Sequence, residues 1–240
     1  MGIFLTGGSG KLGSAIRNSG LFPNILAPSH QELDITDEKS VERYVKDHDF
    51  EGIIHVAALK SLLDCEKDPA RAILINVLGT ANLVRAVIAK NISLRFTYIS
   101  TDGVYEGTKG NYSESDGTIP YSNYGWTKLG GECAVRLLSN ACIIRSSFFD
   151  PDDIPFEDAP DDMYSSKLPV KDFVQSISKI YFSKVKGILN VGCARMSLYE
   201  IYKQYKHGLK RSSFDKIRRE VSTPLAKDCS LDSTLFKKLF

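Results

Sequence analysis

Short apolar runs alternate with amphipathic segments along the first 146 residues of the chain. Apolar runs bounded by turn residues on both sides are typical of strands buried in a parallel sheet. Five such runs occur, at residues 3–6, 24–27, 52–58, 95–100 and 141–146. Four intervening segments place apolar residues at helical spacing, at 11–19, 37–48, 69–90 and 124–139. Strands joined by helical crossovers predict an α/β fold with a doubly wound parallel sheet.

The pattern changes beyond residue 146. Residues 150–162 contain seven acids, three prolines and no basic residue, so we expect a surface loop there. The elements predicted after it are two helices and one strand, at 170–183, 197–205 and 187–191. We therefore divide the chain into a first domain, residues 1–146, and a reduced C-terminal lobe, residues 147–240, some segments of which pack back on the first domain.

Composition narrows the classes of protein that fit. The 240 residues carry 31 Lys and Arg against 29 Asp and Glu, a net charge of +2, which argues against nucleic-acid binding. Residues 203–219 hold seven of the basic residues, and we interpret them as a solvated face rather than an anion site. Five cysteines without a C-x-x-C pair indicate a reduced, cytoplasmic protein without a metal site. Because no uninterrupted apolar run approaches the ~20 residues of a membrane helix, no membrane segment is expected.

A glycine-rich segment lies where the first strand gives way to the first helix. It reads Thr6-Gly7-Gly8-Ser9-Gly10-Lys11-Leu12-Gly13, with Gly7, Gly10 and Gly13 in G-x-x-G-x-x-G spacing. The early glycines let the backbone approach a pyrophosphate, the last lets the helix pack on the sheet, and the helix N-terminus attracts the anion. This pattern predicts a Rossmann dinucleotide site. The residues expected to contact the dinucleotide are Gly7, Ser9, Gly10, Lys11, Leu12 and Gly13.

The residues after the second strand bear on the choice of cofactor. An acid at this place would bind the ribose 2′-hydroxyl of NAD, whereas hydroxyl or basic side chains tolerate the 2′-phosphate of NADP. The sequence here is Ala27-Pro28-Ser29-His30 and contains neither an acid nor an arginine. It favours NADP(H) over NAD(H), with Ser29 and His30 as candidate contacts.

Four tyrosines are followed by a lysine four positions later, and one pair lies where catalysis needs it. Tyr124 and Lys128 open a helix after the fourth strand, which ends at Ser100-Thr101, and their spacing puts both side chains on one helix face. A tyrosine with a pKa of ~10 is a weak acid at neutral pH, and an adjacent ammonium is expected to lower that pKa. We predict Thr101, Tyr124 and Lys128 as the catalytic residues. Thr101 would bond the reacting oxygen, and Lys128 would also hold the nicotinamide ribose.

The order of these motifs resembles that of the extended short-chain dehydrogenase/reductases acting on nucleotide sugars. Two further segments carry this resemblance, His55-Val56-Ala57-Ala58-Leu59-Lys60 and Asn76-Val77-Leu78-Gly79-Thr80. Within the superfamily, the segments most similar to the dTDP-4-dehydrorhamnose reductase family are Glu32-Leu33-Asp34-Ile35-Thr36-Asp37, Val104-Tyr105-Glu106-Gly107 and residues 112–132. The resemblance implies an NAD(P)-dependent oxidoreductase that reduces the 4-keto group of a nucleotide-linked deoxysugar in polysaccharide or cell-surface sugar biosynthesis. The substrate would be the nucleotide sugar, and a homodimer is compatible with this interpretation.

The same resemblance assigns further cofactor contacts. Asp34 and Ile35 would flank the adenine, and Ala57 and Ala58 would line the cofactor cleft. Lys60 would reach the ribose or a phosphate. The remaining candidates are Ser100, which closes the fourth strand, and Asn76, which would support a water network near Lys128.

Alternatives to a reductase stay open. Asp102 is followed by Gly103 and not by the second acid or lysine that dehydratases of this superfamily use, which disfavours dehydration. A C4 epimerase that keeps NAD tightly bound would fit the same motifs. So would a non-catalytic NAD(P)-binding regulatory subunit, because the regulatory subunit of methionine adenosyltransferase also resembles these reductases. Arg145 is a candidate contact for a substrate pyrophosphate, although a structural role is favoured for it.

Overall fold

A six-stranded parallel sheet forms the centre of the computed structural model, which describes residues 2–240. The strands run in the order β10-β5-β4-β3-β1-β2. Their bounds are β1 (Gly2–Thr6), β2 (Ile25–Leu26), β3 (Phe50–His55), β4 (Arg95–Ile99), β5 (Ala141–Ser146) and β10 (Gly187–Val191). The doubly wound α/β fold is confirmed.

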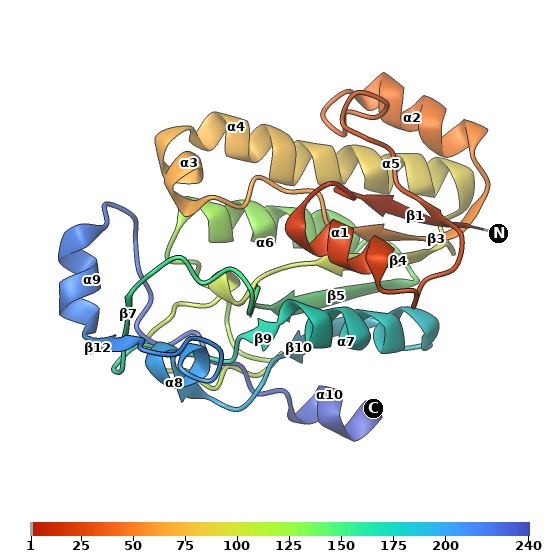
Figure 1. Ribbon diagram of the computed structural model, residues 1–240. Coiled ribbons are helices and arrows are strands. Elements are labelled where there is room, and N and C mark those ends of the chain that lie inside the picture. The colour runs from red at the N-terminus through yellow and green to blue at the C-terminus, as the bar shows by residue number, and fades with distance from the viewer. Residues whose placement is uncertain (1) are drawn as a thin grey trace.

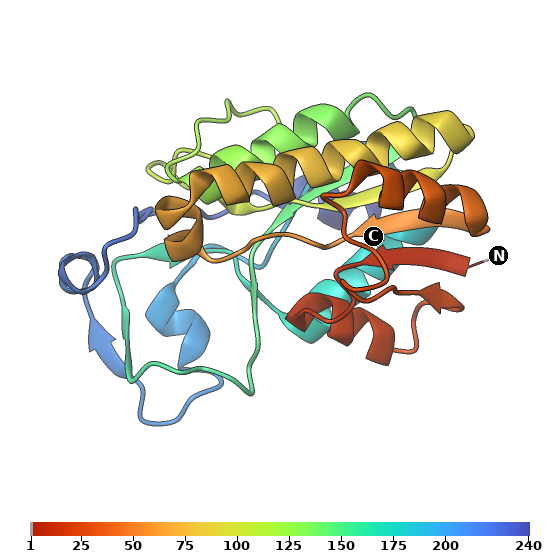
Figure 2. The ribbon, with the colours of Figure 1, turned by 90° about the horizontal axis from the view of Figure 1, so that it is seen from above.

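Helices cover both faces of this sheet. Successive side chains of a strand point to opposite faces, so Ile3 and Leu5 of β1 join one apolar cluster and Phe4 joins the other. The first cluster packs under α1 (Lys11–Asn18) and α7 (Val170–Phe182), and the second under α2 (Glu38–Asp47), α5 (Gly79–Asn91) and α6 (Asn123–Val135). Figure 2 shows these two helical layers with the sheet between them.

The helix predicted over 69–90 is more elaborate than its pattern indicates. A short helix, α3 (Leu62–Lys67), precedes it, and the long run consists of α4 (Pro69–Ile73), a π-helical turn (Leu74–Leu78) and α5. Asp68 caps its start by accepting a hydrogen bond from the Arg71 N–H at 2.9 Å. The run Pro69–Asn91 is long and apolar enough to cross a membrane by length and composition only, a test that core helices of other folds also pass. Packing explains part of its apolar character, since 44% of its most apolar window is buried inside the fold.

The remaining elements gather beside the carboxyl ends of the main strands (Figure 1). They are β6 (Phe148–Phe149), β7 (Asp158–Pro160), β8 (Tyr164–Ser165), β9 (Leu168–Pro169), β11 (Met196–Ser197), α8 (Leu198–Tyr202), β12 (Lys210–Ser212) and α9 (Phe214–Glu220). The last helix, α10 (Thr234–Leu239), instead packs beside β10 at the edge of the sheet. Not all of the chain after residue 147 lies beside those carboxyl ends. β10 pairs in parallel with β5, and α7 packs on the sheet, so both belong to the first domain in space.

The acidic stretch 150–162 was predicted to be a loop throughout, but part of it forms a strand. Its residues 158–160 form β7, which pairs in parallel with β12 of the basic stretch. Ion pairs accompany this pairing: Lys206 with Glu157 at 3.1 Å, Arg211 with Asp161 at 3.2 Å, and Lys216 with Asp158. The interpretation of 203–219 as a solvated face was therefore incomplete, because several of its cations neutralise the acids that make 150–162 look irregular.

Candidate active site

A cleft of about 1150 Å³ opens at the carboxyl ends of β1, β3, β4 and β5. The chain leaves β1 for β2 on one side and then crosses to β3 on the other, and ligands of open α/β sheets bind at such a switch point. Most of the predicted site residues line this cleft: Gly7, Ser9, Gly10, Lys11, Leu12, His30, Asp34, Ile35, Ala57, Ala58, Lys60, Ser100, Thr101, Tyr124 and Lys128. Gly13, Ser29 and Asn76 are not among the lining residues.

The glycine loop has the shape that a dinucleotide pyrophosphate requires. Gly7 has a φ of 71°, and a Cβ there would lie 2.7 Å from the Ala57 backbone nitrogen. A Cβ on Gly13 would lie 2.1 Å from the Gly7 carbonyl oxygen, so Gly13 serves the contact between helix and loop. Gly10 is the N-cap residue of α1, and no side chain within residues 2–240 accepts a capping hydrogen bond from the start of this helix. The first N–H groups of the helix are therefore available to an anion. The loop therefore fits the cofactor predicted from its sequence.

Asn76 acts on the cleft from behind its wall. It lies in the π-helical turn, and its side-chain oxygen accepts a hydrogen bond from the Leu59 N–H at 2.8 Å. Its amide nitrogen donates to the Leu59 carbonyl at 3.0 Å and to the Thr127 hydroxyl at 2.9 Å. Asn76 fixes the segment that carries Ala58 and Lys60 and ties it to α6, while its support of a water network near Lys128 stays a prediction.

Two exposed residues for which no cofactor contact was predicted lie near the adenosine end of the cleft without lining it. The Glu32 carboxylate accepts a hydrogen bond from the Ser29 N–H at 2.8 Å, so an acid lies beside the predicted ribose contacts. A Cβ on Gly8 would lie 2.8 Å from the Ala27 Cβ and 3.4 Å from the Arg17 Cδ, so the Arg17 side chain passes the end of β2. Both were missed because they come from a helix and a turn rather than from the residues directly after the strand.

Lys11 connects the glycine loop to the acidic stretch. Its ammonium lies 2.7 Å from Asp153 and 3.5 Å from Asp150. The hydrogen bond to Asp153 raises the pKa of Lys11. In this structure Lys11, the predicted cofactor contact, therefore forms an ion pair with two acids that also line the cleft.

The three predicted catalytic side chains come from two elements that touch. Thr101 follows β4, while Tyr124 and Lys128 occupy successive turns of α6, which Ser122 caps by accepting a hydrogen bond from the Gly125 N–H at 3.2 Å. A Cβ on Gly125 would lie 2.2 Å from the Gly103 carbonyl oxygen, so only glycine lets the helix come this close to the end of β4. This contact brings Tyr124 to Thr101 in the cleft.

The electrostatics of the pair differ from the prediction. Burial raises the pKa of Tyr124, and the nearby carboxyl of Asp102 adds to this increase, while Thr101 opposes it. Burial also lowers the pKa of Lys128 to about 7. Lys128 is 2% exposed, and its ammonium lies 4.0 Å from the centroid of the Tyr98 ring. The expected lowering of the Tyr124 pKa by Lys128 is wrong, because burial dominates and Lys128 is not among the groups that shift the pKa of Tyr124.

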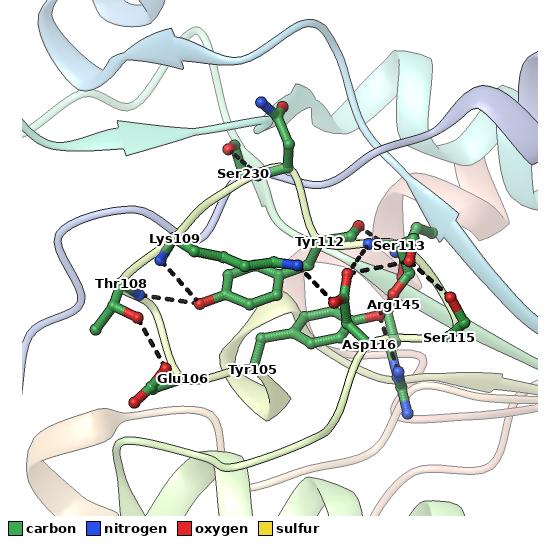
Figure 3. A network of polar contacts seen from close by, with 12 residues as sticks. Tyr105, Glu106, Thr108, Lys109, Tyr112, Ser113, Ser115, Asp116, Arg145 and Ser230 are labelled. Carbon is green, nitrogen blue, oxygen red and sulfur yellow. Dashed lines mark hydrogen bonds and ion pairs between the residues drawn. The ribbon is translucent and has the colours of Figure 1, made fainter.

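A buried ion pair supports the catalytic helix. Glu132 of α6 and Arg145 of β5 are 0% and 1% exposed, and the guanidinium contacts both carboxylate oxygens, at 3.0 and 2.7 Å. Arg145 also donates to the Tyr105 hydroxyl at 2.9 Å. Figure 3 shows Arg145 next to Tyr105, below a loop whose residues are joined by further polar contacts. Arg145 is thus a structural residue and is not free to meet a substrate pyrophosphate.

The wall opposite the cofactor residues adds side chains that were not predicted as site residues. Asp102, Tyr121, Lys167 and Cys229 all line the cleft near Tyr124. Within residues 2–240, no group of three or more His, Cys, Asp or Glu side chains is arranged to hold a metal ion. Lys167 and Cys229 were not predicted as site residues, and both are far from the glycine loop in the sequence.

Comparisons with known proteins agree on the first part of the chain. The family described as "RmlD substrate binding domain" matches residues 1–150. A probable low-salt glycan biosynthesis reductase of Haloferax volcanii is 36% identical in an alignment of 160 positions that covers 60% of this chain and 52% of that protein. A dTDP-4-dehydrorhamnose reductase of Mycolicibacterium smegmatis is 33% identical over 61% of this chain and 45% of its own. The beta subunit of methionine adenosyltransferase 2 of Xenopus laevis is 34% identical over 55% and 42%. The matches thus span about half the length of these relatives.

Solved structures resemble the whole chain. A hypothetical dTDP-4-dehydrorhamnose reductase from Sulfolobus tokodaii has a TM-score of 0.87 at 26% identity, over 100% of this chain and 95% of that one. A dTDP-4-dehydrorhamnose reductase from Bacillus anthracis in complex with NADP has a TM-score of 0.86 at 23% identity, over 99% and 93%. The fold of the C-terminal lobe is therefore shared with these proteins, although its sequence is not matched by the family.

Proposed function

Because this chain belongs to the RmlD substrate-binding domain family, we propose that it is an NAD(P)H-dependent reductase of the 4-keto group of a nucleotide-linked deoxysugar. The observation that carries the proposal is that Thr101, Tyr124 and Lys128 line the same cleft as the glycine loop. Relatives named as dTDP-4-dehydrorhamnose reductase and glycan biosynthesis reductase support both the reaction and a role in polysaccharide or cell-surface sugar biosynthesis.

The C-terminal lobe is the proposed site for the sugar nucleotide. Residues on both sides of β7 and near the C-terminus, including Asp150, Met163, Lys167 and Leu225, face the cleft across from Tyr124. The domain division at residue 146 then separates cofactor from substrate, except that β10 and α7 return to the cofactor domain.

The residues of the chain suit the transfer of a proton to a carbonyl oxygen. A bound nicotinamide cofactor supplies the hydride to C4. Thr101 donates a hydrogen bond to the carbonyl oxygen, and the Tyr124 hydroxyl gives its proton to the oxygen as negative charge develops there. Because the raised pKa of Tyr124 keeps the phenol protonated, the residue is poised as an acid. Lys128, one helical turn away, stabilises the phenolate that remains.

The preference for NADP(H) is supported by Arg17, whose side chain lies at the end of β2. Replacement of Arg17 by alanine should weaken NADPH binding by about fivefold, the effect of one exposed ion pair, and should leave NADH binding within about twofold. Titration of the quenching of protein fluorescence by each cofactor measures this difference. Arg218→Ala, on α9 away from the glycine loop, serves as the control. Equal loss of affinity for both cofactors would exclude Arg17 from recognition of the 2′-phosphate.

A coupled reaction tests the proposed activity. Purified protein is mixed with a 4,6-dehydratase and its dTDP-, UDP- or GDP-sugar, and loss of NADPH is followed together with the sugar product. The proposal predicts NADPH consumption that depends on the dehydratase. Interconversion of C4 epimers without NADPH consumption, by protein that retains NAD through dialysis, would identify an epimerase instead.

A second candidate is a non-catalytic NAD(P)-binding regulatory subunit, which the similarity to the methionine adenosyltransferase beta subunit favours. It predicts no turnover with any 4-keto sugar nucleotide and tight binding to a partner protein. The presence of Thr101, Tyr124 and Lys128 together in the cleft favours the enzyme.

A further inference from the structure

The Thr101 hydroxyl carries one proton, and in this structure that proton is already used. Thr101 donates to the Asp102 carboxyl oxygen at 3.1 Å and accepts from the Gly103 N–H at 3.1 Å. A hydroxyl oxygen can accept two hydrogen bonds but donates only one. While Asp102 is ionised, the Thr101 hydroxyl donates its proton in a hydrogen bond to this carboxylate and cannot donate it to the substrate carbonyl.

Asp102 occupies surroundings that oppose its negative charge. Its carboxyl is 8% exposed and lines the cleft between Thr101 and the C-terminal lobe. Burial raises the pKa of Asp102 to about 6, although the ammonium of Lys167 acts against this increase. The other titratable groups that face it are Tyr121, Tyr124 and Cys229, and all three have raised pKa values, so they are uncharged at neutral pH.

We propose that Asp102 is a positioning residue whose neutral carboxyl donates to the Thr101 oxygen and so turns the Thr101 proton toward the substrate carbonyl. The proposal rests on the reductase function given above. In this arrangement the Thr101 oxygen would accept from the protonated Asp102, the reverse of the bond in the structure, would keep the bond from the Gly103 N–H and would donate to the substrate, so its bonding capacity would be complete. Loss of the Asp102 proton reverses the direction of the bond between the two side chains. It also places a negative charge beside the oxygen that becomes negative in the reaction, which is unfavourable.

Asp102→Asn tests this directly, because an amide nitrogen donates to Thr101 at every pH. The neutral fraction of Asp102 falls about tenfold for each pH unit above its pKa. The ratio of kcat/KM of the variant to that of the wild type should therefore rise about tenfold between about pH 7 and about pH 8. The titration of Lys128 affects both proteins equally and cancels in this ratio. In a Thr101→Val background the same substitution should leave the ratio independent of pH.

A second measurement does not depend on turnover. Infrared spectra of the protein with bound NADP+ should contain the carbonyl band of a protonated carboxyl that titrates near pH 6 and is missing in Asp102→Asn. Absence of that band, or a kcat/KM ratio that is constant with pH, would overturn the role of Asp102 in an active reductase. If no sugar is reduced at all, the proposed function fails, while the infrared band still reports whether Asp102 is held neutral.

Discussion

Replacement of Tyr124 by phenylalanine is expected to lower kcat by about 10²–10⁴-fold, the usual contribution of a general acid. The variant loses only the hydroxyl that protonates the oxygen at C4. NADPH should bind with nearly wild-type affinity, because the glycine loop and the Arg17 region are untouched. Steady-state assays with the coupled dehydratase and fluorescence titration of NADPH measure the two quantities.

The chain offers a matched control for this substitution. Tyr199 is also followed by a lysine four residues later, and the Lys203 ammonium lies 5.3 Å from the centroid of its ring. Because this pair does not line the cleft, Tyr199→Phe should change kcat by less than about twofold. Turnover by Tyr124→Phe at the rate of the wild type would remove Tyr124 from the catalytic step.

Removal of the Glu132 carboxylate should cost about 3–5 kcal/mol of the free energy of unfolding, because Arg145 would be left as an uncompensated buried charge. The loss also frees the Ser100 hydroxyl, which donates to Glu132 at 2.6 Å. Urea denaturation of Glu132→Ala at neutral pH gives the value. Loosening of α6 should accompany it and reduce turnover more than cofactor affinity.

Two comparisons isolate the buried ion pair. Glu38→Ala breaks an exposed pair with Arg85 and should cost less than about 1 kcal/mol. The double variant Glu132→Met with Arg145→Met removes both charges and should recover a large part of the loss. A cost for Glu132→Ala no greater than that for Glu38→Ala would contradict the structural role of the pair.

Local patterns predicted most of the fold and the cofactor half of the cleft. Continuous apolar runs gave the strands, and the strand β10 was predicted with its exact bounds. Tyr124 was chosen among four similar tyrosines from its position after β4, and it lies in the cleft beside Thr101. These features depend on neighbours along the chain, which is why the sequence reveals them.

Features that depend on distant partners were missed or misjudged. Residues 158–160 form a strand by pairing with β12, and Lys216 of α9 neutralises Asp158 in that strand. The Arg17 side chain lies near the end of β2 because Gly8, which has no side chain, leaves room for it. The predicted direction of the shift in the Tyr124 pKa was wrong, because burial raises this pKa and no sequence motif encodes burial.

The fate of the hydride tests the central claim most directly. Protein is incubated with a 4-keto nucleotide sugar and NADPH that carries deuterium at the transferred C4 position, and the product is examined by mass spectrometry and NMR. A reductase of this kind places deuterium at C4 of the sugar and forms one NADP+ for each sugar reduced. A product without deuterium at C4, or no reduced sugar from any of the dTDP-, UDP- and GDP-linked substrates, would contradict the account.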